Sequence, residues 1–327
     1  MLLGKLPPSS NKIIDEVYSE VTDLLRRKSQ NENDEARIKL MLSAAKYLDK
    51  EQVFTELFTL HPDVDENDVF SAANLILQYS ESKLDFESLV RYPVILILDS
   101  DLQPFPWESL PCMTRSKQAV SRVPSLKYLS TMWKFHEEST LSIVNSGVSQ
   151  ESVFYMINPD KSLPKTQERL EGVMKGHSSW EGIFGEPPKP GQLANMLSKK
   201  DAYIYSGHGD GSIFMSIEEV KKLKIRSVPI LLGCRSAELA RYGRNLDPVG
   251  IAQSYLVGCS PAIAGFLWPV TDGDVDQWTV EFLEYWMQGK QLSLLQAIAD
   301  KRAAFKSFVN SAALVVYGFP ISLKSDA

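Results

Sequence analysis

Short runs of apolar residues, rich in β-branched side chains, alternate with helical stretches along most of the chain after residue 90. A strand buried in a parallel sheet is apolar on both faces, and parallel neighbours need a helical crossover between them. The pattern therefore predicts an α/β domain over residues 91–327, with a mostly parallel six-stranded sheet covered by helices on both faces. The predicted strands lie in PVILILDS (residues 93–100) and at residues 152–158, 202–207, 227–233, 262–268 and 313–319.

Residues 1–90 have a different pattern, in which apolar residues such as Val17, Val21 and Leu24 recur at helical spacing. Further stretches begin with capping residues and continue with good helix formers, as in NDEARIKLMLSAAKYLDK. We expect a small all-helical segment here, separate from the α/β domain. Nothing in its sequence indicates catalysis.

The composition excludes several classes of protein. The 327 residues carry a net charge of −6 without a long Lys/Arg run, so there is no electrostatic footprint for nucleic acid. Cys112, Cys234 and Cys259 are too few for a disulfide framework and favour a reducing compartment. The start of the sequence lacks the apolar core of a signal peptide, and no apolar stretch reaches the length of a membrane span. We therefore expect a soluble intracellular protein without a membrane partner.

One histidine stands among glycines in YIYSGHGDGS (residues 203–212), just after a predicted strand, and Cys234 follows the next strand along the chain. Consecutive parallel strands are usually neighbours, so His208 and Cys234 are expected at adjacent carboxyl ends. Such an imidazole can activate a thiol for attack on an amide, and the amides of Gly209 and Cys234 are suited to bind the oxyanion. The alternative is an inert buried thiol and a structural histidine.

Three acids follow a later strand, in WPVTDGDVDQW (residues 268–278). Asp272, Asp274 and Asp276 fit a helix N-terminus, where carboxylates complement the helix dipole. They also fit the base of a cleft that selects a basic side chain, preferably arginine, by bidentate pairing. The glycine spacing at residues 207–211 matches neither a dinucleotide fingerprint nor a P-loop, and no His/Cys cluster has metal-ligand spacing. We expect no cofactor and no metal.

With these residues in view, the chain resembles separase, the caspase-like cysteine endopeptidase that opens cohesin rings at anaphase. The resemblance covers roughly residues 90–325 and consists of seven blocks in the same order. These blocks are ILDSDLQPFPWESLP, FYMINPDKSL, WEGIFGEPPKPGQL, DAYIYSGHGDG, LLGCRSAEL, AGFLWPVTDGDVD and VVYGFPISL.

The resemblance implies a caspase-like fold and a role for each candidate residue. Cys234 and His208 would form the catalytic dyad, and the amides of Gly209 and Cys234 the oxyanion hole. Asp276, with Asp272 and Asp274, would line the pocket for the arginine before the scissile bond. The implied substrate is the kleisin subunit of cohesin, the implied inhibitor is securin-like, and the implied location is the cytoplasm and nucleus.

The chain departs from the family pattern at two places. Arg235 stands where the family usually has serine, and Pro269 where it usually has aspartate. Most separases also carry a long helical-repeat region, of which residues 1–90 would be at most a remnant of the substrate-binding helices. The competing hypothesis is a catalytically inactive caspase-like scaffold or binding module, against which the retention of both His208 and Cys234 argues.

Overall fold

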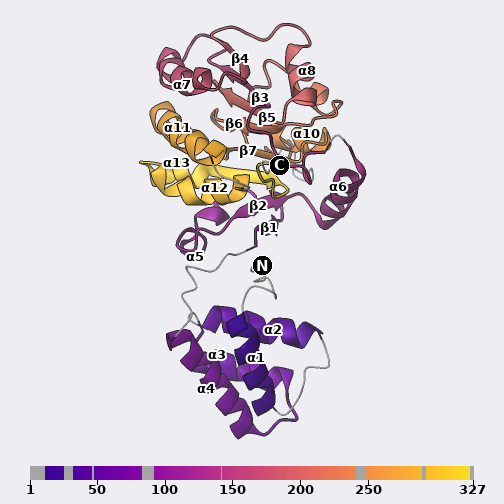
Figure 1. Cartoon of the computed structure of the whole chain (residues 1–327), viewed down its shortest axis with the longest axis vertical. Helices are drawn as coiled ribbons and strands as arrows, with labels where there is room; N and C mark the ends of the chain where they lie inside the picture. Colours follow the sequence, from indigo (N-terminus) through magenta and orange to yellow (C-terminus); the bar gives the residue numbers. More distant parts are fainter. Residues whose placement is uncertain are drawn as a thin grey trace. The chain divides into compact units, whose positions relative to one another are not determined.

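A computed structural model describes residues 12–25, 32–45, 48–82, 92–140, 142–240, 248–288 and 292–324. The chain divides into two compact units, Leu2–Tyr92 and Pro93–Ala327 (Figure 1).

The first unit is all helical in its described parts. Its apolar side chains meet in one small core to which every helix contributes, including Val17 and Val21 of the predicted helical stripe, whereas Leu24 stays 37% exposed. Asp49 opens the third helix with a capping box, in which its carboxylate accepts from the Gln52 amide at 2.8 Å. The helices are α1 (Lys12–Leu24), α2 (Glu32–Ala44), α3 (Lys50–Leu60) and α4 (Glu66–Ser82).

The second unit is built on one mixed sheet, whose strand order in the described residues is β1-β2-β8-β7-β6-β5-β3-β4. All neighbours pair in parallel except β7 and β8. The mostly parallel α/β architecture is thus confirmed. The strands are β1 (Val94–Ile97), β2 (Val120–Val123), β3 (Val153–Ile157), β4 (Glu181–Phe184), β5 (Ala202–Ser206), β6 (Val228–Leu231), β7 (Ala262–Phe266) and β8 (Leu314–Gly318).

The sheet has eight strands in the described residues, so the expected number of six was too low. The six predicted runs all form strands, and β2 and β4 are the additions. β2 (VSRV) carries an arginine in its middle, and β4 (EGIF) lies at the sheet edge with Ile183 as its buried residue. Neither segment has the continuous apolar run that marks the other strands.

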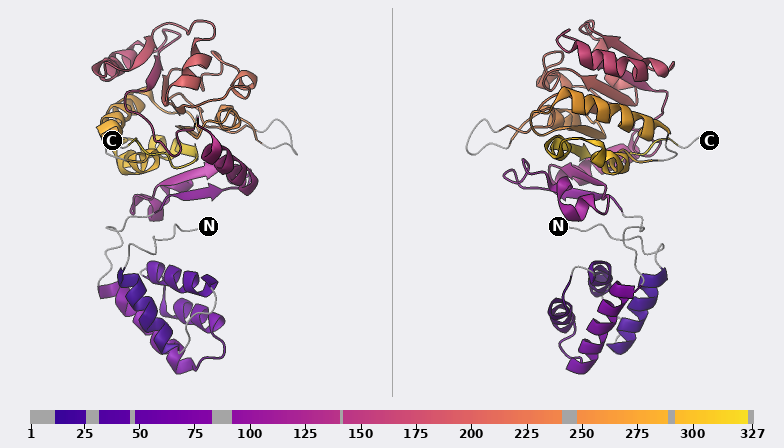
Figure 2. Two further views of the ribbon diagram at one scale, coloured as in Figure 1. Left: turned by 45° about the vertical axis from the view of Figure 1, so that its right-hand side comes forward. Right: turned by 90° about the vertical axis from the view of Figure 1, so that its left-hand side faces the viewer.

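Helices cover both faces of the sheet (Figures 1 and 2). Successive side chains of a strand point to opposite faces, so in β5 Ala202 and Ile204 join one apolar core while Tyr203 and Tyr205 join the other. The first core is shared with α7, α11 and α12, and the second with α8, α9 and α10. The helices of this unit are α5 (Pro111–Thr114), α6 (Leu126–Glu138), α7 (Pro164–Gly176), α8 (Gln192–Lys199), α9 (Ile217–Val220), α10 (Ile251–Val257), α11 (Asp272–Gln288), α12 (Leu294–Lys301) and α13 (Phe308–Ala313), with 3-10 turns at Trp107–Ser109 and Arg302–Ala304.

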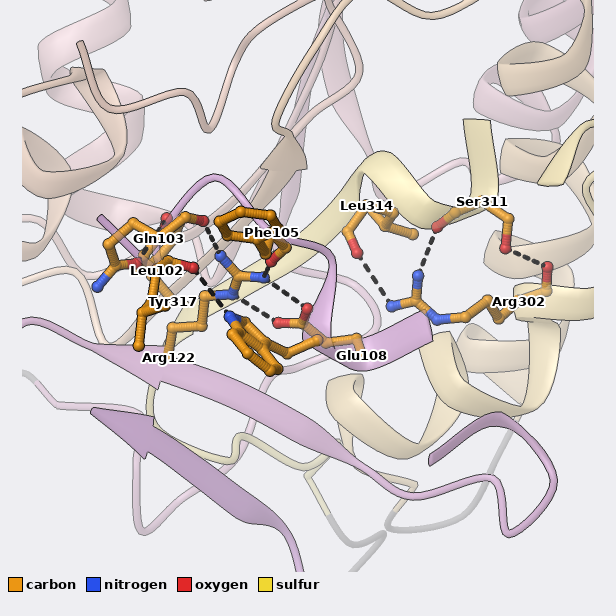
Figure 3. Close-up of polar contacts among 10 residues, drawn as sticks. Leu102, Gln103, Phe105, Glu108, Arg122, Arg302, Ser311, Leu314 and Tyr317 are labelled. Atoms are coloured by element: carbon orange, nitrogen blue, oxygen red, sulfur yellow. Dashed lines mark hydrogen bonds and ion pairs between the residues drawn. The ribbon is translucent and has the colours of Figure 1, made fainter. Parts of the chain in front are cut away.

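The arginine of β2 is buried in the sheet and paired with a carboxylate (Figure 3). Arg122 donates Nε to Glu108 at 2.7 Å and Nη2 to the same carboxylate at 2.6 Å. It also donates to the backbone carbonyls of Gln103 and Phe105. These bonds satisfy a guanidinium that would otherwise be costly to bury, and they hold the loop after β1 against the sheet.

A second buried arginine, Arg302, bonds to backbone carbonyls instead (Figure 3). Its guanidinium donates to the carbonyls of Ser311 and Leu314, and the Ser311 hydroxyl donates to the Arg302 carbonyl at 3.0 Å. The side chain thereby joins the end of α12 to α13 and the start of β8.

We expect Arg122→Leu to lower the free energy of unfolding by about 3–5 kcal/mol, because it leaves Glu108 buried without its cation. Chemical denaturation of the variant checks the value. The double variant Arg122→Leu with Glu108→Leu should recover much of the loss, since no unpaired charge remains. Lys134→Leu removes the exposed ion pair of Lys134 with Glu138 and should change stability by less than about 0.5 kcal/mol. If Arg122→Leu lowered the free energy of unfolding as little as Lys134→Leu does, the stabilising role given to the buried pair would be wrong.

Candidate active site

The two strands that precede His208 and Cys234 lie side by side in the sheet. β5 and β6 pair in parallel, with Tyr205 opposite Leu231 near their carboxyl ends. The two strands therefore end together, and the turns that carry His208 and Cys234 leave the same edge of the sheet. This is the adjacency that the order of the strands predicts.

The two turns touch backbone to backbone. A Cβ built on Gly233 would lie 1.9 Å from the carbonyl oxygen of Gly209 and 2.6 Å from that of Gly207. Gly209 has a φ of +65°, a conformation that glycine adopts readily. The Tyr205 hydroxyl donates to the His208 carbonyl at 2.7 Å and fixes the far side of the loop. Gly233 is thus needed because it packs directly on the histidine loop, whereas Gly209 is needed for its backbone conformation.

The turn after β6 is also tied to β7. The buried Ser236 hydroxyl donates to the Leu231 carbonyl at 2.8 Å and accepts from the Phe266 amide at 3.0 Å. Arg235 has a φ of +59°, and its exposed side chain lies 3.5 Å from the Glu238 carboxylate. Cys234 therefore sits at the start of a turn with little freedom to shift.

The Cys234 thiol hydrogen-bonds to the loop after β7. Its sulfur accepts from the Val270 amide and donates to the Val270 carbonyl, both at 3.4 Å. His208 is exposed, and although both residues are described, no hydrogen bond joins it to the thiol. Catalytic hydrogen bonds are often long in unliganded sites and tighten only with substrate, so the missing bond is no argument against a catalytic pair.

Asp160 lies near His208, a neighbour that the sequence analysis did not identify. It follows β3, which pairs with β5 on the side opposite β6. Partial burial raises the pKa of Asp160, but hydrogen bonds from Ser162 and the charge of nearby His208 outweigh it, so the pKa lies below its ordinary value. The carboxylate therefore stays ionised at neutral pH, on the loop after β3.

The three acids after β7 have three different environments. Asp276 is buried, with its carboxylate accepting from Arg169 at 2.8 Å and from the Thr166 hydroxyl at 3.0 Å, both on α7. Burial raises the pKa of Asp276 even though these two hydrogen bonds favour its ionised form. The acid that was the first choice for binding a substrate arginine is therefore already paired with an arginine of the chain.

Asp274 is buried and has a structural set of partners. Its carboxylate accepts from the amides of Lys306 at 2.7 Å and Ser307 at 3.0 Å, and from the Asn310 side chain at 2.7 Å. Burial acts to raise the pKa of Asp274, but these hydrogen bonds outweigh it and the pKa is lowered. The ionised group thus stabilises the fold at neutral pH, and this contribution is lost in acid as the pH falls through the folded-state pKa.

Asp272 is the exposed acid of the three, at the first residue of α11. It borders a cleft of about 460 Å³ between the start of α7 and the start of α11. The cleft holds charges of both signs, since Lys165 and Arg169 also line it. Of the predicted pocket residues, Asp272 is the one that borders this cleft.

Metal binding and membrane insertion receive no support from the described parts of the chain. Within those ranges, no three histidine, cysteine or acidic side chains gather closely enough to hold a metal ion. None of the helices described is both long and apolar enough to cross a membrane.

Comparison with known proteins decides the family. The family model described as "Separin, protease domain" matches residues 8–275. The chain belongs to the separin family. The match begins before residue 90, so the family likeness extends into the helical unit, whose sequence carries no chemical motif.

Curated separins show how much of a family member the chain represents. It is 33% identical to mouse separin over 323 residues, which is 98% of this chain and 15% of the mouse protein. It is 34% identical to the Schizosaccharomyces pombe separin over 241 residues, which is 70% of this chain and 13% of that protein. The chain therefore spans a small part of the length of these relatives.

A solved structure of the Saccharomyces cerevisiae separase–securin complex has the same fold. Its TM-score is 0.73 at 23% sequence identity, covering 98% of this chain and 23% of that chain. The predicted separase resemblance and the separase-type α/β fold are thereby confirmed, and the family match supports a peptidase.

We expect Gly233→Ala to destabilise the fold by at least about 1–3 kcal/mol, because the new methyl group overlaps backbone oxygens that have no room to retreat. Denaturant unfolding measures the change. The control is Gly172→Ala in α7, where nothing lies within 4 Å of the added Cβ. It should stabilise the protein by about 0.5–1 kcal/mol through helix propensity. Equal effects of the two variants would refute the backbone contact.

Proposed function

We propose that this chain is a cysteine endopeptidase of the separase type, with Cys234 as the nucleophile and His208 as the general base. The observation that carries the proposal is the contact of Gly233 with the Gly207–Gly209 loop at the ends of two paired strands. It keeps the thiol-bearing turn and the imidazole-bearing turn together at one edge of the sheet.

The proposed reaction follows from these groups. His208 takes the thiol proton, and the Cys234 thiolate attacks the peptide carbonyl to form a tetrahedral intermediate. The amides of Gly209 and Cys234 donate to its oxyanion. The imidazolium then protonates the leaving amine, and water hydrolyses the thioester to release the second product and the free thiol. Asp160 stabilises the imidazolium while it carries the proton.

The proposed substrate is the kleisin subunit of cohesin, cut after arginine to release sister chromatids at anaphase. A securin-like protein is the proposed inhibitor, and the cytoplasm and nucleus are the proposed locations. The support is the family match and the solved relative, which is a separase in complex with securin.

For the arginine pocket we propose the cleft beside α7 and α11, with Asp272 as the direct contact. Its carboxylate is exposed at the cleft, whereas Asp274 is engaged by backbone amides and Asp276 by Arg169. Asp276 reaches a substrate only when Arg169 leaves it. A guanidinium can bind one carboxylate with two parallel hydrogen bonds, which an ammonium cannot do.

Cys234→Ser should abolish cleavage of an arginine peptide, and His208→Ala should lower kcat by about a hundredfold to ten-thousandfold. Both variants should keep the wild-type melting temperature. The measurement is single-turnover cleavage together with labelling by an arginine-terminated acyloxymethyl ketone, with Cys112→Ser as the control thiol variant. Absence of labelling in the folded wild type would instead favour the inactive scaffold.

Asp272→Asn should lower kcat/KM for arginine peptides by about fivefold, because an exposed charge pair contributes about 1 kcal/mol. The ratio of kcat/KM for paired arginine and lysine peptides should fall, while Asp274→Asn should leave the ratio unchanged and reduce stability. If Asp276→Asn alone changed the ratio, Asp276 would be the pocket acid and Arg169 would leave it during binding.

A further inference from the structure

Three phenylalanines of α3 and α4 form an aromatic cluster at the surface of the helical unit, in which Phe54 packs against the helical core. Phe58 is 41% exposed and Phe70 is 46% exposed, with the half-buried Phe54 between them. Val53 and Leu57, each one position earlier in α3, are fully buried in the core. Phe54 thus connects the core to an exposed apolar surface, formed by Phe58 and Phe70, that the core leaves uncovered.

The three rings form an ordered surface beside a cleft. The centroid of Phe54 lies 5.9 Å from that of Phe58 in a stacked arrangement and 6.3 Å from that of Phe70 in an edge-to-face arrangement. The cleft has a volume of about 590 Å³ and is lined by Lys50, Glu51, Phe54, Glu66, Asn67 and Phe70. It is large enough to accept a long side chain with part of its backbone.

A cation already occupies one face of the cluster. The Lys50 ammonium lies 3.8 Å from the centroid of the Phe70 ring. Such a contact is attractive because the ring face is electronegative, and an arginine guanidinium suits it better since it is planar and less strongly hydrated.

The surroundings of the cleft are strongly acidic. Residues 49–68 contain seven acidic residues and one lysine, a net charge of −6 that equals the net charge of the whole chain. Glu51 and Glu66 border the cleft, and neither takes part in an ion pair with the residues that the structure describes. Glu56, on the same helix, is paired with Arg37 at 2.8 Å. A cationic ligand would therefore meet two available carboxylates beside the aromatic faces.

We propose that the cleft between α3 and α4 docks an arginine-bearing, positively charged segment of a partner protein. One guanidinium replaces the Lys50 ammonium over Phe70 and pairs with Glu66, which lies one helical turn earlier on the same face of α4. A second copy of this chain is a poor occupant because the surface carries a strong charge of one sign. The inference goes beyond the proposed function, since it uses neither Cys234 nor His208.

The test uses the full chain with Cys234→Ala, so that no peptide is cut. The probe is a fluorescein-labelled peptide of three Arg-Leu-Ser repeats, and its matched control has citrulline in place of arginine. Fluorescence anisotropy should show binding of the arginine peptide and at least about tenfold weaker binding of the citrulline peptide, because citrulline is neutral. Raising the salt concentration should weaken the binding of the arginine peptide.

Variants locate the binding. Phe70→Leu and Glu66→Gln should each weaken binding by about three- to tenfold, and Lys50→Ala should tighten it by removing the competing cation. Phe308→Leu and Glu284→Gln make the same changes at exposed positions of the other unit and should have no effect. If Phe70→Leu proves unfolded by circular dichroism, Lys50→Ala and Glu66→Gln decide the question.

Three results would overturn the proposal. One is equal affinity for the arginine and citrulline peptides. Another is unchanged affinity in both Glu66→Gln and Lys50→Ala. The third is a concentration-dependent dimer that the same substitutions abolish and that excludes the peptide, because a second copy would then occupy the cleft.

Discussion

The contact of Gly233 with the carbonyl oxygens of Gly207 and Gly209 determines how the two turns of the site meet. The parallel ladder of β5 and β6 brings the turns to one edge, but the ladder alone leaves their separation open. The Gly233 backbone packs so closely on these carbonyl oxygens that even a Cβ atom would not fit between them. The Tyr205 hydroxyl also holds the loop by donating a hydrogen bond to the His208 carbonyl, so the turns that carry the imidazole and the thiol share one support.

The same edge of the sheet is reinforced from β7. Ser236 joins the thiol-bearing turn to Phe266 at the end of that strand, and the thiol itself bonds to Val270 just beyond it. Asp274 then fixes the start of α11 to the amides of Lys306 and Ser307. A search for catalytic acids or nucleophiles would select Ser236 and Asp274, although their hydrogen bonds here stabilise the fold. A polar residue at a strand edge can thus be structural, as its backbone hydrogen-bond partners show for Ser236 and Asp274.

The apolar runs predicted six strands because a buried strand is visible in local composition. Chain order predicted that β5 and β6 lie side by side. β2 was not predicted because Arg122 interrupts its apolar pattern. The burial of Arg122 depends on its ion pair with Glu108, which lies in the connection between β1 and β2. Asp160 was not selected although it follows the strand predicted at residues 152–158, which is next to the strand before His208 in chain order and pairs with it in the sheet. The partner of Asp276 lies 107 positions away in sequence, and no pattern reveals a contact at that separation.

The contact between Arg169 and Asp276 means that any guanidinium of a ligand must compete with Arg169 for the Asp276 carboxylate. Arg169 belongs to the same folded unit, so its effective concentration at Asp276 is on the order of millimolar or higher. A guanidinium arriving from solution binds there only during the fraction of time in which the internal pair is open, and its apparent affinity falls by that fraction. The Arg169 side chain is 44% exposed, so it can swing into water without unfolding the helix that carries it. We therefore expect short free peptides to bind weakly at Asp276, and a ligand held nearby by contacts elsewhere to have the advantage.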